Sequence, residues 1–322
     1  MAYSLDGNDV PVKWALVAAS LLASVTMVAG WQPQFKSGVE VVYLDVTVQA
    51  PDGSIVRGLS KDDFLVYDED APQDVAIFSD EPAPISVGVL IDTSGSMTGE
   101  RMASATRAAD ALGRSLRQGD LWSISTFDSI RRTMITWRPY NPAIVNSLRA
   151  MPTSGSTELF KAVADMVPYM KDTPHRKRAM LLMTDGIDNS IIAASHDGPG
   201  DPFEAPGPRE SSAKAEAALR EGEVLLYALG INVAGRTGDV HVKSLQRLAE
   251  PTGGSVIVAS TVREVESAAQ RVAEELRQQY TIGFYPQNPG DKAYHRLRVT
   301  TRHPDYRVRT RAGYVTASSK QG

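Results

Sequence analysis

An apolar run that ends abruptly in polar side chains constrains this chain most. Residues 85–91 read Ile-Ser-Val-Gly-Val-Leu-Ile, and Asp92, Ser94 and Ser96 follow at alternating positions. Such a run is typical of a parallel strand that is buried on both faces of a sheet. A tight loop after the strand can turn one carboxylate and two hydroxyls toward a hard cation such as Mg²⁺. The alternative is a polar turn in which Ser94 or Ser96 caps the next helix.

Two later motifs have the composition that a shared cation site requires. Residues 154–157, Ser-Gly-Ser-Thr, precede an apolar helix that we expect Thr157 to begin and Pro168 to kink or end. Residues 184–186, Thr-Asp-Gly, follow a predicted strand at 179–183. In an open α/β sheet, the loops at the carboxyl ends of the strands converge on one crevice, so three loops can share one ion. Thr157 is equally a good helix N-cap, and that alternative stays open.

Together these motifs resemble the metal-ion-dependent adhesion site of the von Willebrand factor A domain family, over about residues 83–278. The resemblance implies a doubly wound, Rossmann-like α/β fold with a mostly parallel central sheet. It also implies bound Mg²⁺, with Mn²⁺ or Ca²⁺ as alternatives, and direct contacts from the hydroxyls with the two carboxylates acting partly through water. The implied ligands are Asp92, Ser94, Ser96, Thr157 and Asp185. Glu158 departs from the small residue that the family pattern leads us to expect.

Around these motifs, helical and strand patterns alternate. We expect helices at 102–116, which Gly119 ends, at 212–220 and at 242–249. A capping box at Thr261–Glu264 begins one more helix after these. We expect strands at 121–127, 132–137, 224–231 and 255–258. The connection 187–209, which contains His196, is long enough to be either a ligand-selecting rim loop or disordered.

Sequence before and after this region alternates with the period of strands. A hairpin is predicted from residues 42–48 and 55–56, and two short strands are predicted at 64–67 and 75–78. Three more strands are predicted at 280–285, 297–300 and 306–309. The early strands carry Asp62, Asp63, Asp68, Glu69, Asp70 and Asp74; the late ones carry outward Arg296, Arg298, Arg302, Arg307 and Arg309. We therefore favour a discontinuous β-sandwich-like domain, 36–82 with 279–316, into which 83–278 is inserted and after which 317–322 form a tail. Two independently solvated faces are the alternative. Segments 59–64 and 279–284 also resemble bacterial secreted proteins with a related A domain.

The first 35 residues contain an uncharged run at 14–30 that is preceded by Lys13. Its length lies between a signal-peptide core and a membrane-spanning helix. We favour a secretory leader over a retained N-terminal hydrophobic anchor helix, with a buried core helix as the third reading. Both main readings place the rest of the chain outside the cytoplasm, either secreted or periplasmic, or associated with a membrane through 14–30.

Composition narrows the function. A net charge of −4 argues against nucleic acid as a partner, and the absence of cysteine excludes thiolate sites and disulfides. The five histidines are scattered, and no hydrolase motif occurs, so we expect no enzyme. The predicted function is metal-dependent protein binding, for adhesion or assembly, in which an Asp or Glu carboxylate of a partner completes the cation's shell. A scaffold with a vestigial site is the alternative, and a metal-dependent hydrolase is a weaker one.

Overall fold

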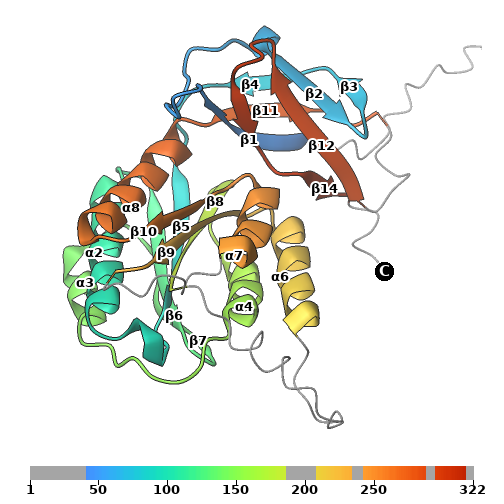
Figure 1. Ribbon diagram of the computed structural model, residues 1–322. Coiled ribbons are helices and arrows are strands. Elements are labelled where there is room, and N and C mark those ends of the chain that lie inside the picture. Colours follow the sequence, from blue (N-terminus) through green and yellow to red (C-terminus); the bar gives the residue numbers. More distant parts are fainter. Residues whose placement is uncertain (1–40, 186–207, 234–241, 288–293, 317–322) are drawn as a thin grey trace, which may run out of the picture. The chain divides into compact units, whose positions relative to one another are not determined.

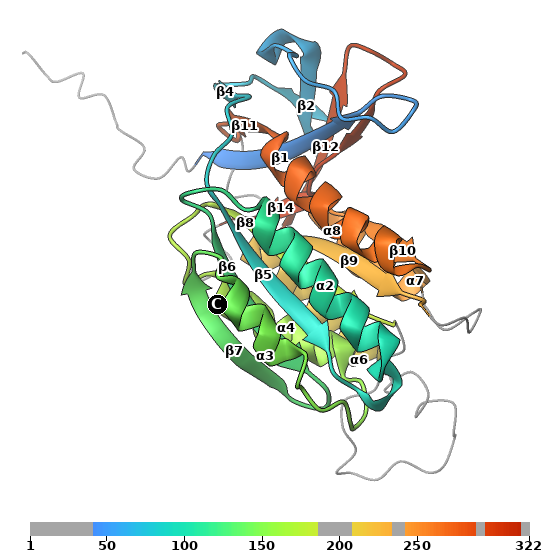
Figure 2. The same ribbon diagram turned by 90° about the vertical axis from the view of Figure 1, so that its left-hand side faces the viewer.

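The computed structural model describes residues 41–185, 208–233, 242–287 and 294–316. Its larger sheet has six strands in the order β10-β9-β8-β5-β6-β7, and only the β6–β7 pair is antiparallel. The strands are β5 (Ile85–Asp92), β6 (Leu121–Phe127), β7 (Arg131–Arg138), β8 (Lys177–Thr184), β9 (Leu225–Ile231) and β10 (Val256–Ala259). Every residue of β5 is buried, as its apolar run predicts. Figure 2 shows β7 and β10 at opposite edges of this sheet.

Helices cover both faces of the six-stranded sheet (Figure 1). One face packs against α2 (Glu100–Ser115), α3 (Pro142–Leu148) and α8 (Val262–Arg277). The other packs against α4 (Leu159–Met170), α6 (Pro208–Gly222) and α7 (Val242–Ala249). This mixed α/β arrangement, with a mostly parallel sheet between two helical layers, confirms the predicted fold class. The hydrophobic segment 14–30 lies outside the described residues.

Helix boundaries differ from the sequence prediction in three places. Helix α2 ends at Ser115, four residues before Gly119, because the Asp120 carboxylate accepts a hydrogen bond from the Arg117 amide (2.8 Å) and closes a turn. Helix α4 begins at Leu159 instead of Thr157 and continues two residues past Pro168. Helix α3 was not predicted; it begins with Pro142 after Asn141, whose side chain accepts a hydrogen bond from the Ala143 amide (3.0 Å).

Eight further strands of the described residues form two four-stranded sheets, in the orders β13-β1-β11-β4 and β14-β12-β2-β3. They are β1 (Val42–Gln49), β2 (Phe64–Asp68), β3 (Ala71–Gln73), β4 (Ile77–Ser79), β11 (Tyr280–Phe284), β12 (Tyr294–Thr301), β13 (Arg307–Arg309) and β14 (Gly313–Val315). Strands from the two ends of the chain pair with each other, β1 with β11 and β2 with β12. Leu44 and Ile282 of one sheet share an apolar core with Val66 and Val299 of the other. The domain boundaries suggested by the sequence stay a prediction.

Some details of the small sheets were predicted wrongly. The expected return strand at 55–56 is a single bridge between Gln49 and Ile55. Asp68 is not an outward acid, because it is buried and accepts a hydrogen bond from the Tyr314 hydroxyl (2.8 Å). Arg309 is not an outward base either, since its guanidinium pairs with Glu275 of α8. Tertiary contacts thus give these two charged side chains internal partners.

Buried polar contacts join the end of α8 to its surroundings. The Lys177 ammonium donates to the Leu276 carbonyl (3.1 Å), and Arg277 pairs with Asp120 (2.8 Å). The Gln279 amide donates to the Thr47 hydroxyl of β1 (3.1 Å). The six-stranded domain and the small sheets are therefore linked by specific bonds.

Within the described ranges, no helix has both the length and the apolar character that crossing a membrane requires.

Candidate functional site

Asp92 and Asp185 follow adjacent parallel strands, so the sheet brings them to the same edge. The pairing of Ile91 with Met183 places both strand ends side by side. The Thr184 hydroxyl donates to Oδ2 of Asp92 (2.7 Å), and the Ser94 amide donates to Oδ1 (2.8 Å). Both aspartates are fully buried. Two carboxylates are therefore held together where water is largely excluded.

The loop after β5 presents its two serines to each other. Ser94 precedes a single 3₁₀ turn, Gly95–Met97, and its hydroxyl lies 3.1 Å from that of Ser96. The side chain of Ser94 makes no capping hydrogen bond, and the N-cap of α2 is Gly99 at φ +68°. The alternative in which either serine caps the next helix is therefore wrong. Both hydroxyls remain available for another role.

Backbone hydrogen bonds bring the Thr157 loop against the serine loop. The Ser154 amide donates to the Thr93 carbonyl (2.9 Å), and the Gly95 amide donates to the Gly155 carbonyl (3.2 Å). Glu158 occupies the N-cap position of α4, and its amide donates to the Asp128 carbonyl in the β6–β7 turn (3.0 Å). Thr157 itself is 2% exposed. The structure therefore brings all three predicted loops into contact, directly or through Asp92.

Burial strongly affects the electrostatics of the two aspartates. It raises the pKa of Asp92 to about 6, and the nearby Asp185 charge adds to the increase, whereas hydrogen bonds from Ser94 and Thr184 oppose it. Asp185 accepts a hydrogen bond at Oδ2 from Arg101, but its buried Oδ1 has no hydrogen-bond partner among the residues that the structure describes. An unsatisfied carboxylate oxygen in such a place is costly unless a cation or water binds it.

The donor set suits a hard divalent cation. Two carboxylates and three hydroxyls offer only oxygen ligands, which Mg²⁺ prefers. Mg²⁺ usually keeps several waters, and these would fill the positions of its octahedron that the protein oxygens leave open. In the described parts of the chain, no cluster of three or more His, Cys, Asp or Glu side chains is placed to hold a metal ion. A site rich in carboxylate or imidazole ligands is therefore a poor description of this crevice.

Arg101, at the second position of α2, is the residue that sequence reasoning missed. Its guanidinium donates to Oδ2 of Asp185 (2.8 Å) and to the carbonyl of Ser96 (3.1 Å), and its side chain is only 11% exposed. The arginine thus places a positive charge beside the proposed ligands. Its position in sequence gives no signal of this role, because Asp185 is 84 residues away.

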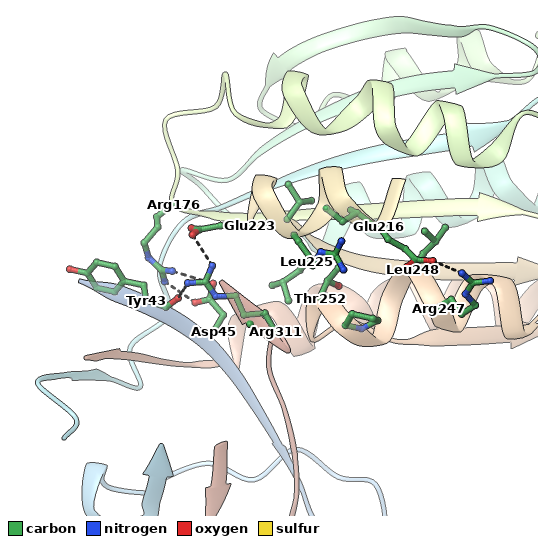
Figure 3. A pocket seen from close by; sticks show the side chains of 15 residues that line it. Tyr43, Asp45, Arg176, Glu216, Glu223, Leu225, Arg247, Leu248, Thr252 and Arg311 are labelled. Atoms are coloured by element: carbon green, nitrogen blue, oxygen red, sulfur yellow. Dashed lines mark hydrogen bonds and ion pairs between the residues drawn. The ribbon is translucent and has the colours of Figure 1, made fainter. Parts of the chain in front are cut away.

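A small cavity elsewhere is a weaker candidate. It measures about 70 Å³ and lies among α6, the start of β9, α7 and the strand β1 (Figure 3). Six of its seven charged groups pair with one another: Arg176 with Asp45 (2.7 Å), Arg311 with Glu223 (2.7 Å) and Arg247 with Glu216 (2.8 Å). The seventh, Arg220, lies over the ring of Tyr294 (5.6 Å to the ring centroid). Because these groups already have partners, the cavity offers little to a charged ligand.

Several sequence predictions lie outside the described residues. They are Gly186 of the third motif, the part of the rim connection at 187–207 and His196 within it. Only Pro208 and Arg209 of that connection are described, and they belong to the first turn of α6.

Comparisons with known proteins identify the domain that contains these loops. The family model of the von Willebrand factor type A domain matches residues 87–187. The chain carries a von Willebrand factor type A domain. The match begins at the third residue of β5 and includes the serine loop and the strand β8 that ends before Asp185. A comparison with the curated proteins found no match.

Solved structures match this chain at low sequence identity. A von Willebrand factor type A structure from Catenulispora acidiphila is 13% identical, with 89% of this chain and 76% of that chain covered and a TM-score of 0.50. The protein BatB from Bacteroides thetaiotaomicron is 17% identical, with 60% and 97% covered and a TM-score of 0.45. The A domain of the type V pilus tip protein Mfa5 from Porphyromonas gingivalis is 13% identical, with 60% and 95% covered and a TM-score of 0.46. At these identities the likeness concerns the fold alone.

Proposed function

We propose that this chain is an extracytoplasmic protein-binding module for adhesion or assembly, and that a divalent cation mediates the binding. The cation, Mg²⁺ with Mn²⁺ or Ca²⁺ as alternatives, would be held by Asp92, Ser94, Ser96, Thr157 and Asp185. The unsatisfied, fully buried Oδ1 of Asp185 beside the buried Asp92 carries this proposal. Location outside the cytoplasm rests on the apolar segment at 14–30 and stays part of the proposal.

The charges at the site favour an acidic partner group. The two aspartates balance a divalent cation, and Arg101 adds one further positive charge within hydrogen-bond distance of Asp185. An occupied site would therefore attract a carboxylate more strongly than the aspartates and cation alone would. The partner's Asp or Glu would take a coordination position that water otherwise fills.

Catalysis is a weaker reading of the same residues. A bound cation can lower the pKa of a water, but hydrolysis also needs a group that moves protons near the reacting bond. The groups around the two aspartates in the described structure are hydroxyls, backbone amides and Arg101. None of these serves readily as a general base at neutral pH, and the two aspartates that could do so are the proposed ligands of the cation, so binding fits the site better.

Thermal unfolding with Mg²⁺ or with chelator tests the proposal. Mg²⁺ at about 100 times its dissociation constant should add about 2.7 kcal/mol to the free energy of unfolding. Ser96→Ala should remove this gain. Ser156→Ala is the matched control, because Ser156 lies in the same crevice, bonds Ser129 (3.0 Å) and is not a proposed ligand. A wild-type protein that is indifferent to Mg²⁺, Mn²⁺ and Ca²⁺ would favour the scaffold with a vestigial site.

Partner chemistry is tested with a short glutamate-containing peptide and its glutamine counterpart. Binding of the glutamate peptide should require the cation and fail in Ser96→Ala. Equal binding of both peptides would contradict the proposed role of the carboxylate.

A further inference from the structure

We propose a second binding site, a groove between β10 and the strands β12 and β13, for an extended acidic peptide segment of a partner protein. The groove encloses about 660 Å³. Its lining, which we call the basic groove, comprises Gln49, Gln246, Glu250, residues 254–257, Arg271, Glu275, residues 297–299 and residues 307–312. This site is separate from the proposed cation site and does not depend on it.

Unpaired strand edges line the basic groove. Strand β10 pairs only with β9, and β13 pairs only with β1, among the described strands. Residues 297–301 of β12 pair with β2 on one side, while β14 covers only 294–296 on the other. The Leu297 amide donates to the Ala312 carbonyl (2.8 Å), and the Gly254 carbonyl just before β10 accepts from the Arg309 guanidinium (3.0 Å). The rest of these edges has no strand partner among the described residues. An extended peptide satisfies the backbone groups of such an edge by adding a strand.

Positive charge dominates the lining, although the whole chain is acidic. Five arginines and two glutamates line the groove, but three of the arginines are already paired: Arg298 with Asp70 (3.5 Å), Arg309 with Glu275 and Arg311 with Glu223 (2.7 Å). Glu250 makes no ion pair within the described residues, so the excess of positive charge comes from the two arginines that have no carboxylate partner. Glu275 is already neutralised, because it pairs with Arg309 and accepts a hydrogen bond from the Tyr227 hydroxyl (2.6 Å). Arg271 and Arg307 are exposed, and neither makes an ion pair within the described residues. The groove therefore offers unpaired guanidinium groups to carboxylates.

Apolar side chains lie between these charges. Val256, Ile257 and Val308 are half-buried in the lining, and Leu297 and Val299 are 9% and 7% exposed. Val258, the next residue of β10, is 43% exposed. Leu297 and Val299 belong to the core of the small sheets, so the apolar area open to a ligand comes from Val256, Ile257, Val258 and Val308. A strand whose side chains alternate between acidic and apolar could place one set on the arginines and the other on these four side chains. Nucleic acids and acidic glycans have the charge but not the apolar side chains, so a peptide fits better.

The groove lies at the opposite end of the sheet from the proposed cation site. It includes the beginning of β10 and the last turns of α8, whereas the cation loops follow the carboxyl ends of β5 and β8. The Ala312 amide donates to the Pro251 carbonyl (2.8 Å), and Gly253, at φ +87°, lies against the backbone of Thr310. A Cβ at position 253 would be 2.7 Å from the Thr310 carbonyl carbon, so this close approach requires glycine. These contacts fix one side of the groove.

Fluorescence anisotropy with the full chain tests this site. The probe is a labelled peptide of about eight residues that alternates glutamate and valine, long enough to follow a strand edge. It should bind in the presence of chelator, and added salt should weaken the binding because charge pairs drive part of it. The double variant Arg271→Glu, Arg307→Glu should weaken binding by about tenfold or more, a loss of about 1.4 kcal/mol. Arg263→Glu, a matched charge reversal at an exposed position of α8 outside the groove, should leave affinity within about twofold.

Other outcomes would overturn the assignment. These are no binding by the wild type, equal weakening by Arg263→Glu, or capture of a heparin fragment or an oligonucleotide in place of the peptide. Binding that requires Mg²⁺ and disappears in Ser96→Ala would move the peptide to the cation site and reject the groove. The double variant is informative only if its unfolding curve matches that of the wild type. If it does not, the double variant Arg271→Gln, Arg307→Gln replaces it in the binding measurement and should also weaken binding.

Discussion

Arg101 and a bound cation should compete to neutralise Asp185. The Arg101 side chain is 11% exposed and that of Asp185 is 0% exposed, so the 2.8 Å pair is largely desolvated. Removing one partner of such a pair leaves a buried charge and costs about 3–5 kcal/mol. Arg101→Met should therefore lower the free energy of unfolding by about 3 kcal/mol in chelator, the low end of that range because Arg101 keeps some contact with water.

Mg²⁺ should recover much of that loss. Suppose that Mg²⁺ reduces the difference in unfolding free energy between wild type and Arg101→Met from about 3 to about 1 kcal/mol. Linkage then requires that Arg101→Met bind Mg²⁺ about 30-fold more tightly than the wild type. Urea unfolding with and without millimolar Mg²⁺ measures the first quantity, and titration calorimetry measures the second. Arg114→Met is the control, because its pair with Asp110 is exposed on the same helix and should change stability by only about 0.5 kcal/mol. If Mg²⁺ raised the free energy of unfolding equally in wild type and in Arg101→Met, Arg101 and the cation would not compete for Asp185.

Two further perturbations test the buried groups. Burial raises the pKa of Asp92 to about 6 in the metal-free folded state, above its value in the unfolded chain. The folded state therefore binds a proton at a pH where the unfolded state has lost it. The resulting stability is present at low pH and is lost as the pH rises through about 6. In chelator, wild type should therefore gain about 1 kcal/mol relative to Asp92→Asn between about pH 7 and about pH 5, and a pH-independent difference in urea unfolding would contradict this. Gly254→Ala would place a Cβ on the Leu226 carbonyl oxygen and should cost about 3 kcal/mol or more; a melting temperature within a degree of the wild type would show that the backbone yields easily.

Local patterns were sufficient for most of the central domain. The run before Asp92 predicted a strand buried on both faces, and β5 is one, because a central parallel strand between two helical layers is covered on both faces. The capping box at Thr261 and Glu264 begins α8 as predicted, since both of its hydrogen bonds form within one turn. Signals that act over a few residues are visible in the sequence.

Contacts between distant residues could not be predicted in this way. The pair between Arg101 and Asp185, and the pair between Arg309 and Glu275, depend on how helices and strands dock, and neither position carries a local pattern. The same holds for the basic groove, whose walls come from strands far apart in the chain. Sequence alone determined the types of element and the candidate oxygen ligands, because periodicity and motif spacing are local. Only the tertiary structure decided which charges are buried together and which strand edges stay open, because those depend on packing between elements.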